Sequence, residues 1–275
     1  MAFEGPGITA LGLAAARAVE SSRPDRLIED PFARELFAAA HSDLPLRTEW
    51  PAPGEEVSDR EALHLHGSRY IGVRTRFYDD LLLDSTAEQA VLLGAGLDTR
   101  AHRLALKQRL FELDQPGVLE HKEATLPAPR CERRAVAADL SDGAWPEDLA
   151  AAGFDPAKPT AWVAEGLLPY LDVAAQANLL RHVDALSAAG STIALDRIVG
   201  DARERAAGLT ERSGIDMERL FAGGESDPAV ILGWDAHEEP AEAVAARYGR
   251  SLADPFGTSA EPPWLETVFM TATKP

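Results

Sequence analysis

The stretch of the sequence best suited to chemistry is VLLGAGLDTR, residues 91–100, in which two glycines follow a short apolar run. Gly94 and Gly96 would let the backbone turn tightly and approach a ligand with no Cβ in the way. The third glycine of the dinucleotide-binding pattern is missing, and Asp98 would put a negative charge where a phosphate group should lie. The loop therefore favours a ligand that carries adenosine but no phosphate.

Acidic residues recur where the next apolar runs end. Asp114 closes LFELD, 20 positions after Gly94, where an acidic side chain can accept hydrogen bonds from both hydroxyls of a ribose. Asp139 and Leu140 end the following run, at a polar edge that could reach an adenine amino group, and Glu165 ends the run after it. If these runs are parallel strands, all four residues lie on the rim where open α/β sheets bind ligands. The acids on this rim suit a cationic ligand.

The elements that must position these residues are indicated by the hydrophobic pattern. From Ile8 to about Leu83 small and apolar residues recur at three-and-four spacing, which predicts helices, the third of them over 59–83. Short continuous apolar runs then alternate with helical or turn-rich segments, which predicts an α/β fold with a parallel sheet covered on both faces. The predicted strands are 90–96, 110–114, 134–140, 160–167, 191–198, 234–237 and 266–273.

Capping residues mark several helix boundaries. Asp30 is a predicted N-cap ahead of Pro31, and Asp172 stands near the start of an amphipathic helix that Gly190 is expected to end. The segment 45–59, with three prolines and a glycine, is expected to be a flexible connection between two helices.

The composition argues against several classes of partner. The chain has 275 residues and a net charge of −18, which repels phosphate backbones and anionic lipid, so neither nucleic acid nor a membrane surface is an expected partner. The single cysteine, Cys131, excludes an internal disulfide and fits a reducing cytoplasm. We expect a cytoplasmic protein without signal peptide or membrane span, because no basic, uninterrupted apolar segment opens the chain and no apolar run is long enough.

Metal and hydrolase chemistry find little support. The seven histidines form no metal-binding spacing, since His64 and His66 lie two apart on a predicted helix and point to different faces, and we expect no metal. No G-x-S-x-G motif is present, which argues against a serine hydrolase.

Each candidate residue also has a purely structural interpretation. Asp98 could be a helix N-cap, and Asp114 a surface acid. Arg74 stands near Asp79 and Asp80, where ion pairs on a helix surface are common. Glu165 is harder to explain in this way, because an acid flanked by apolar residues is costly to bury without a partner.

Five segments resemble, in order, motifs of the bacterial branch of the leucine carboxyl methyltransferase-like family: RAVESSRPDRLIEDPFA, VLLGAGLDTRAHRL, LFELDQPGVLEHK, AADLSD and GFDPAKPTAWVAEGLLPYL. These are class I O-methyltransferases that depend on S-adenosyl-L-methionine. The resemblance implies a Rossmann-like, doubly wound, mostly parallel sheet of seven strands in residues 87–275. It also implies an N-terminal helical cap in residues 1–86 over the active site, and methyl transfer from S-adenosyl-L-methionine.

The resemblance also assigns roles to residues that match the family motifs. It implies that Gly94, in the loop with Gly96 and Asp98, lies against the methionine part of the cofactor, Asp114 binds the ribose, and Asp139 and Leu140 contact the adenine. It further implies that Glu165 holds the amino group of the cofactor and Arg74 its carboxylate, with Arg17 close to a basic cofactor contact. Ser141 stands where the eukaryotic enzymes that methylate a C-terminal leucine have arginine, which argues against the same protein substrate.

A carboxylate is the expected methyl acceptor. It is ionised at neutral pH, since its reference pKa is near 4, and needs no general base, whereas a phenol with a reference pKa near 10 would need one. No base motif is evident, although the seven histidines leave the phenol or hydroxyl route open. Tyr170 and Arg197 are the residues expected to line the acceptor pocket, with Arg197 orienting an anionic acceptor or pairing with Asp196 or Asp201. The acceptor itself is expected to be a small molecule or a peptide-like secondary metabolite.

Two other classes remain open at this point. A nicotinamide-dependent oxidoreductase would share the strand, the glycine turn and the acid, but the missing third glycine counts against it. A protein that holds the cofactor without turnover is the other alternative.

Overall fold

The computed structural model describes residues 6–199, 221, 227–257 and 266–275. Three helices come before the sheet: α1 (Pro6–Ser22), α2 (Ala33–Ala39) and α3 (Asp59–Asp84). A capping box begins α3, because Ser58 and Glu61 each accept a hydrogen bond from the backbone N–H of the other. Asp30 Oδ1 accepts from the backbone N–H of Ala33 at 3.1 Å, but α2 begins at Ala33 with Phe32 as its N-cap, so the predicted N-cap at Asp30 ahead of a first-turn Pro31 is wrong.

The sheet has seven strands in the order β3-β2-β1-β4-β5-β7-β6. Their bounds are β1 (Gln89–Leu93), β2 (Arg109–Asp114), β3 (Arg133–Ala137), β4 (Thr160–Ala164), β5 (Thr192–Ile198), β6 (Asp235–Pro240) and β7 (Thr267–Thr273). The first five strands are parallel, and β7 runs antiparallel to both β5 and β6. The predicted α/β fold with a mostly parallel, Rossmann-like sheet is therefore confirmed. The strand order reverses at β1, between β2 and β4, where sheets of this kind bind ligands.

Shorter helices connect the strands: α4 (Arg100–Arg103), α5 (Pro116–Thr125), α6 (Trp145–Ala151), the 3₁₀ helix η1 (Leu168–Tyr170), α7 (Val173–Ala185), α10 (Pro228–Leu232) and α11 (Ala241–Arg247). Asp172 caps α7 as predicted, but the predicted end at Gly190 is wrong. The helix ends at Ala185, where the buried Ser187 hydroxyl donates to the Val183 carbonyl, and Gly190 lies in the turn before β5. Among the described helices, none is both long and apolar enough to cross a membrane.

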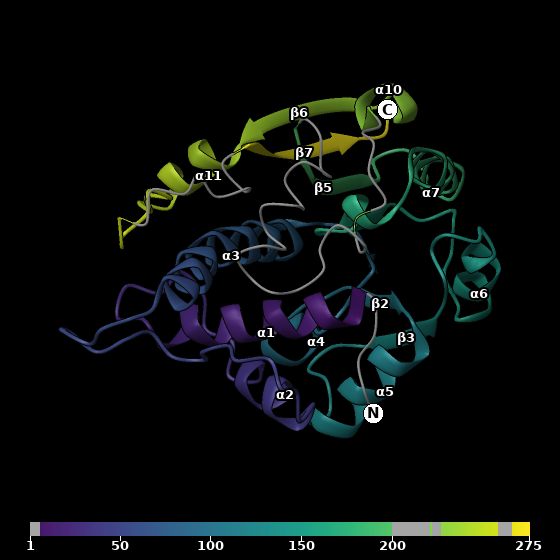
Figure 1. Ribbon diagram of the computed structural model, residues 1–275. Helices are drawn as coiled ribbons and strands as arrows, with labels where there is room; N and C mark the ends of the chain where they lie inside the picture. The colour runs from purple at the N-terminus through teal and green to yellow at the C-terminus, as the bar shows by residue number, and fades with distance from the viewer. Residues whose placement is uncertain (1–5, 200–220, 222–226, 258–265) are drawn as a thin grey trace.

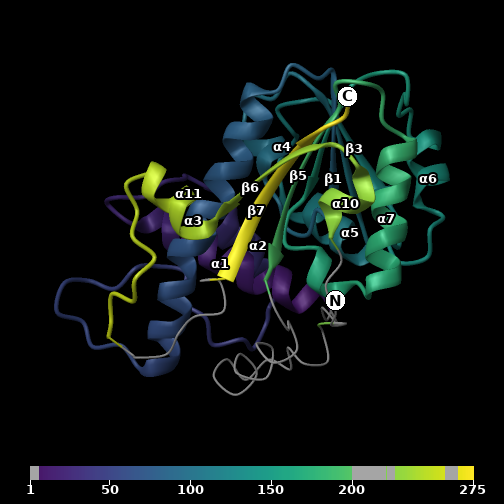
Figure 2. The ribbon, with the colours of Figure 1, turned by 90° about the horizontal axis from the view of Figure 1, so that it is seen from above.

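The two faces of the sheet are covered by different helices. Val91 and Leu93 pack with residues of α6 and α7, whereas Ala90 and Leu92 pack with residues of α3, since successive side chains of a strand point to opposite faces. Figure 2 shows α6 and α7 on one side of the sheet and α3 on the other.

The N-terminal helices contribute to this core and to the ligand rim. Residues 70–82 of α3 pack directly on the sheet, so the predicted cap of residues 1–86 shares the core of the α/β part. Figure 1 shows α1 lying beside α3, with α2 next to α1. Helix α1 therefore lies over the carboxyl ends of the strands, while α3 joins this region to the core.

Candidate functional site

Three adjoining cavities lie at the carboxyl ends of the parallel strands. The first, of about 260 Å³, is lined by the glycine loop and by the ends of β2, β3 and β4, and we call it the rim cavity. The second, of about 60 Å³, lies around Asp98 and Arg100 and is called the inner cavity. The third, of about 280 Å³, lies between α1, α3 and the end of β5 and is called the apolar cavity. Glu165 lines the first two, and Tyr170 and Gly166 line both the rim and the apolar cavities.

The glycine loop faces the aspartate that ends β2. Gly94 and Gly96 have φ of +68° and +49°, a conformation that favours glycine, and a Cβ on Gly94 would lie 3.0 Å from a methyl group of Leu167. Asp114 Oδ2 accepts from the backbone N–H of Gly96 at 2.6 Å, and Oδ1 accepts from that of Gln115 at 2.7 Å. Burial raises the pKa of Asp114, against the lowering effect of these two N–H groups. The carboxylate is thus fixed beside the loop at the edge of the rim cavity.

The residues after β3 also line the rim cavity. The strand ends at Ala137 rather than at the predicted residue 140, so Asp139 and Leu140 lie in the turn that follows. Asp139 Oδ1 accepts from the backbone N–H and the hydroxyl of Ser141 at 2.8 and 2.6 Å, and these bonds lower the pKa of Asp139. Leu140 is buried and presents an apolar surface to the cavity.

Glu165 is held between two arginines that come from different parts of the chain. Arg74 Nε, on α3, donates to Glu165 Oε1 at 2.9 Å, and Arg100 Nη1, at the start of α4, donates to Oε2 at 2.8 Å. Burial alone would raise the pKa of Glu165, but Arg100 and Arg74 outweigh it and lower the pKa below its ordinary value. Glu165, which would be costly to bury without a partner, therefore has charged partners, as expected.

Asp98 lies in the site and is not the N-cap of α4, which is Thr99, so the purely structural interpretation as an N-cap is wrong. Its Oδ1 accepts from the backbone N–H of Arg100 at 2.7 Å, and its carboxylate also pairs with the Arg100 guanidinium. Burial would raise the pKa of Asp98, but Arg100, with smaller effects of Lys122 and Arg103, lowers it to about 2. Arg17 reaches the same inner cavity from α1, where its Nη2 donates to the Leu97 carbonyl at 2.5 Å.

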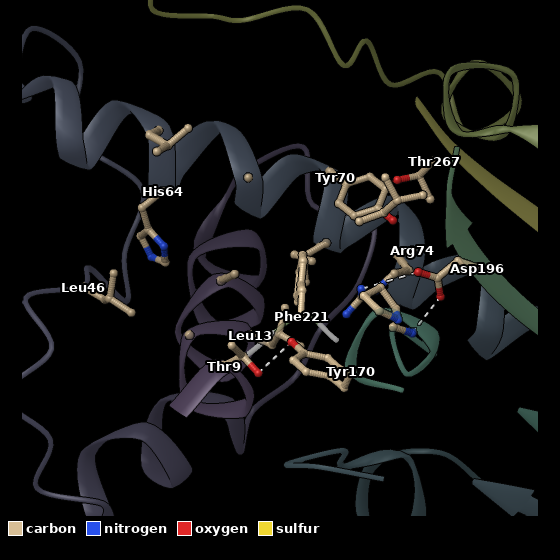
Figure 3. Close-up of a pocket in the computed structure, with 18 of the residues that line it drawn as sticks. Thr9, Leu13, Leu46, His64, Tyr70, Arg74, Tyr170, Asp196, Phe221 and Thr267 are labelled. Carbon is tan, nitrogen blue, oxygen red and sulfur yellow. Dashed lines mark hydrogen bonds and ion pairs between the residues drawn. The ribbon is translucent and has the colours of Figure 1, made fainter. Parts of the chain in front are cut away.

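The apolar cavity meets the rim cavity at Tyr170. The Tyr170 hydroxyl donates to Thr9 Oγ1 at 2.8 Å and so joins η1 to α1. Beside it, Asp196 Oδ1 accepts from the Tyr78 hydroxyl at 2.6 Å and from the backbone N–H of Gly166 at 2.8 Å. Asp196 Oδ2 lies 3.8 Å from Arg74 Nη1, and Figure 3 shows these charged groups at one end of the cavity. Burial raises the pKa of Asp196, against the lowering effect of Arg74 and Tyr78.

The structure does not support the expected role of Arg197. This residue follows Asp196 on β5 and therefore points to the other face of the sheet, where its guanidinium pairs with Glu238 of β6 at 3.1 Å. Arg197 lines neither the rim cavity nor the apolar cavity. Tyr170, the other expected acceptor contact, lines both cavities. Asp201, which the sequence offered as an ion-pair partner for Arg197, lies outside the described residues.

Sequence reasoning missed Arg100 and Asp196 as parts of the site. Arg100 is almost fully buried and contacts Asp79, Asp98 and Glu165, so it organises the acids of the inner cavity. Its signal in the sequence was the motif LDTR itself, since an arginine next to a ligand-loop acid seldom stays unpaired. Asp196 lies two residues before the end of the predicted strand 191–198, near the same rim as the other acids, and that position could have identified it. Among the described residues, no group of three or more His, Cys, Asp or Glu side chains could hold a metal ion.

Comparison with known proteins agrees with this geometry. The family model of leucine carboxyl methyltransferase matches residues 10–184, a span that includes most of α1, the glycine loop and the ends of β1 to β4. A protein of Saccharopolyspora erythraea, provisionally named an S-adenosyl-L-methionine-dependent methyltransferase, is 46% identical over 91% of this chain and 90% of its own length. A protein of Mycobacteroides abscessus with the same provisional name is 41% identical over 88% of this chain and 84% of its own.

Solved structures match the fold. A protein of the DUF574 family from Streptomyces avermitilis superposes with a TM-score of 0.56 at 17% identity, over 94% of this chain and all of that one. A protein from Thermobifida fusca, provisionally described as a methyltransferase, superposes with a TM-score of 0.52 at 17% identity over 94% of both chains. The family model covers more than half of the chain, and the relatives match nearly its whole length. This chain therefore belongs to the leucine carboxyl methyltransferase family.

Proposed function

We propose that this protein transfers the methyl group of S-adenosyl-L-methionine to a carboxylate oxygen of a small molecule or peptide-like secondary metabolite. That the protein is a methyltransferase dependent on S-adenosyl-L-methionine follows from its family and its curated relatives. This activity replaces the nicotinamide-dependent oxidoreductase that the sequence left open. The observation that carries the finer proposal is the contact between the apolar cavity and the rim cavity at Tyr170, with Arg74 beside it.

The residues of the rim cavity fit the cofactor. The two glycines of the loop bring no Cβ atoms into the space beside Asp114, and the cavity is lined by the carboxylates of Asp114 and Asp139 and by the apolar side chain of Leu140. Asp114 would bind the ribose hydroxyls, and Asp139 and Leu140 would contact the adenine. Glu165 and Arg74 would bind the amino and carboxylate groups of the methionine part. When bound, the cofactor supplies an electrophilic methyl group on a sulfonium.

The surroundings of the acceptor favour a carboxylate. All seven histidines lie within the described residues, and of these only His64 lines the apolar cavity, at the end away from Asp196. An imidazole base is therefore missing where methyl transfer would occur, and a carboxylate requires none. Arg74 lies at the same end, where it shares its charge with Glu165, Asp196 and the proposed cofactor carboxylate, so it would orient an acceptor carboxylate rather than supply a net positive field. The residues of α1 and α3 would hold the acceptor in line with the methyl group and exclude water.

A hydroxyl or phenol acceptor is the second candidate, because Asp196 could serve as its base. This carboxylate lines the apolar cavity, and burial raises its pKa, which brings its basicity closer to that needed for proton transfer. Asp196→Asn separates the two candidates. Methylation of a phenol should fall at least about a hundredfold, the contribution typical of a general base, whereas methylation of a carboxylate should keep most of its rate.

The test is release of S-adenosylhomocysteine from the full-length protein with a panel of carboxylic acids, their amides and phenols of matched size. We expect products heavier by one methylene group from the acids, seen by mass spectrometry, with hydroxylamine-sensitive methyl esters. Products formed only from phenols would replace the proposal by its alternative. Cofactor binding without any product across the panel and a cell extract would point to a protein without turnover.

A further inference from the structure

We propose that the acceptor is an elongated apolar acid with a hydroxyl group at its far end, and that His64 recognises this hydroxyl through Nδ1. The inference rests on the proposed function for the acid end, and it adds the length of the acceptor and a second polar contact. It is carried by the shape of the apolar cavity and by the environment of one imidazole.

The cavity follows helix α3 from Arg60 to Arg74. His64 and Arg74 both line it and are ten residues apart, which corresponds to about 15 Å along the helix axis. Figure 3 shows His64 and Leu46 at one end and Arg74 with Asp196 at the other. An acceptor whose acid lies beside Arg74 must therefore be long to fill the cavity.

The wall between the two ends is largely apolar. It is formed by side chains of α1, α3 and the connection between α2 and α3: Leu13, Ala16, Leu46, Leu63 and Ile71. Gly12 widens it, since a Cβ at this position would approach nothing closer than a Leu46 methyl group, at 3.8 Å. Methylene groups bound against such a wall leave water, which stabilises a bound chain in proportion to its apolar length. The middle of the acceptor should therefore be hydrocarbon.

His64 offers a defined hydrogen-bond acceptor at the far end. Its Nε2 lies 2.9 Å from the backbone carbonyl of Arg47, and because a carbonyl only accepts, Nε2 must carry the hydrogen. Burial lowers the pKa of His64, so the ring is neutral at pH 7 and Nδ1 has a lone pair. This nitrogen makes no hydrogen bond to any residue that the structure describes.

The ligand group that Nδ1 accepts from should be neutral. Arg60 lines the same end of the cavity, one turn before His64 on α3, and its positive charge disfavours an ammonium there. A hydroxyl donates to Nδ1 and can accept from a guanidinium, so it matches both side chains. The acceptor class is therefore a long-chain hydroxy acid.

The probes are a series from octanoic to hexadecanoic acid and the same acids with a terminal hydroxyl. We expect one chain length at which the hydroxylated acid has the lower KM, by about tenfold, the value of one hydrogen bond of about 1.4 kcal/mol. His64→Phe should remove this preference by raising KM for the hydroxylated acid, with kcat and the affinity for S-adenosylhomocysteine little changed. His121→Phe is the matched control, because His121 is also half-buried, with Nε2 at 3.0 Å from the Leu36 carbonyl, but lines none of the three cavities.

Gly12→Leu tests the length independently and does not disturb His64. The added side chain should block the middle of the cavity, so that long acids lose at least about tenfold in kcat/KM and octanoic acid does not. Equal KM values for plain and hydroxylated acids at every length, unaltered by His64→Phe, would overturn this inference while leaving carboxylate methylation intact. If the wild type methylates no acid, the proposed function fails, and calorimetry with the same acids and S-adenosylhomocysteine decides this inference alone. In that case, equal or absent binding of the plain and hydroxylated series overturns it.

Discussion

Replacing Glu165 by glutamine removes the charge that joins the rim and inner cavities. In the wild type its oxygens accept from Arg74 Nε at 2.9 Å and Arg100 Nη1 at 2.8 Å. Glutamine has nearly the same size, but its amide nitrogen is a donor and must face one of these guanidinium groups. The ammonium group of a bound cofactor would also lose its charged acceptor.

The magnitude follows from the number of contacts that remain. A hydrogen bond between charged groups contributes about 1.5 to 3 kcal/mol, so the affinity for S-adenosylhomocysteine should fall between about tenfold and about 150-fold. The free energy of unfolding should fall less than the 3 to 5 kcal/mol typical of a broken buried pair. The reason is that Arg100 keeps Asp79 at 2.6 Å together with Asp98, and Arg74 keeps Asp196 at 3.8 Å.

Calorimetric titration gives the affinity, and urea unfolding gives the stability. Glu132→Gln is a matched control, since Glu132 also stands between two arginines, Arg109 at 2.8 Å and Arg134 at 2.9 Å, but is exposed and far from the cavities. This control should keep the wild-type affinity and nearly the wild-type stability, because exposed ion pairs contribute little. A folded Glu165→Gln protein with wild-type affinity would refute the role of this carboxylate.

Three further outcomes are expected. Asp114→Ala should cost about 1 to 3 kcal/mol of binding free energy for S-adenosylhomocysteine, because the ribose loses its acceptor; unchanged affinity by calorimetry would mean that the ribose binds elsewhere. Gly166→Ala should weaken cofactor binding, because the new Cβ would lie 2.8 Å from Arg74 Nη1 and displace this side chain. Its φ of +61° also strains an alanine backbone. Gly233→Ala, with φ of +63° and no atom within 4 Å of the new Cβ, measures the effect of this strain alone on the free energy of unfolding in urea. Asp98 has a pKa lowered to about 2 from an ordinary 3.8, so it stabilises the folded state above pH 3.8 and this stability, about 2 kcal/mol, is lost as the pH falls toward 2. Between pH 5 and pH 2 the free energy of unfolding should therefore fall less steeply for Asp98→Asn than for the wild type. Parallel curves for the two proteins would contradict this.

The strands and the rim could be predicted because their signal is local. Apolar runs such as AVLLGAG and TAWVAEGL fix the strand type, and the polar residue that ends each run must lie at the carboxyl end of a strand. Asp114 and Glu165 were located in this way. Strand ends were less certain, because Ala138 and Leu140 continue the apolar pattern of β3 although the strand has already ended at Ala137.

The partners of these residues could not be predicted, since they depend on distant parts of the chain. Asp196 receives the hydroxyl of Tyr78, 118 positions earlier, and Glu165 receives Arg74, 91 positions earlier. Arg197 illustrates the same limit, because a shift by one residue on a strand exchanges the cavity for the opposite face. Its partner Glu238 comes from β6, whose place at the edge of the sheet depends on the antiparallel pairing with β7.

The charge of the rim has a different meaning once the ion pairs are known. The sequence predicts acidic residues that would bind a cationic ligand. In the structure Glu165 already pairs with Arg74 and Arg100, so the charges in this part of the site are nearly balanced before any ligand binds. The methionine end of the cofactor carries both an ammonium and a carboxylate. When it binds, its ammonium could pair with Glu165 and its carboxylate with Arg74. The contact between Glu165 and Arg74 would then be replaced without leaving either charge unpaired. We therefore expect specificity for a zwitterionic end, because a ligand with the ammonium alone or the carboxylate alone would break the pair and satisfy only one of its members.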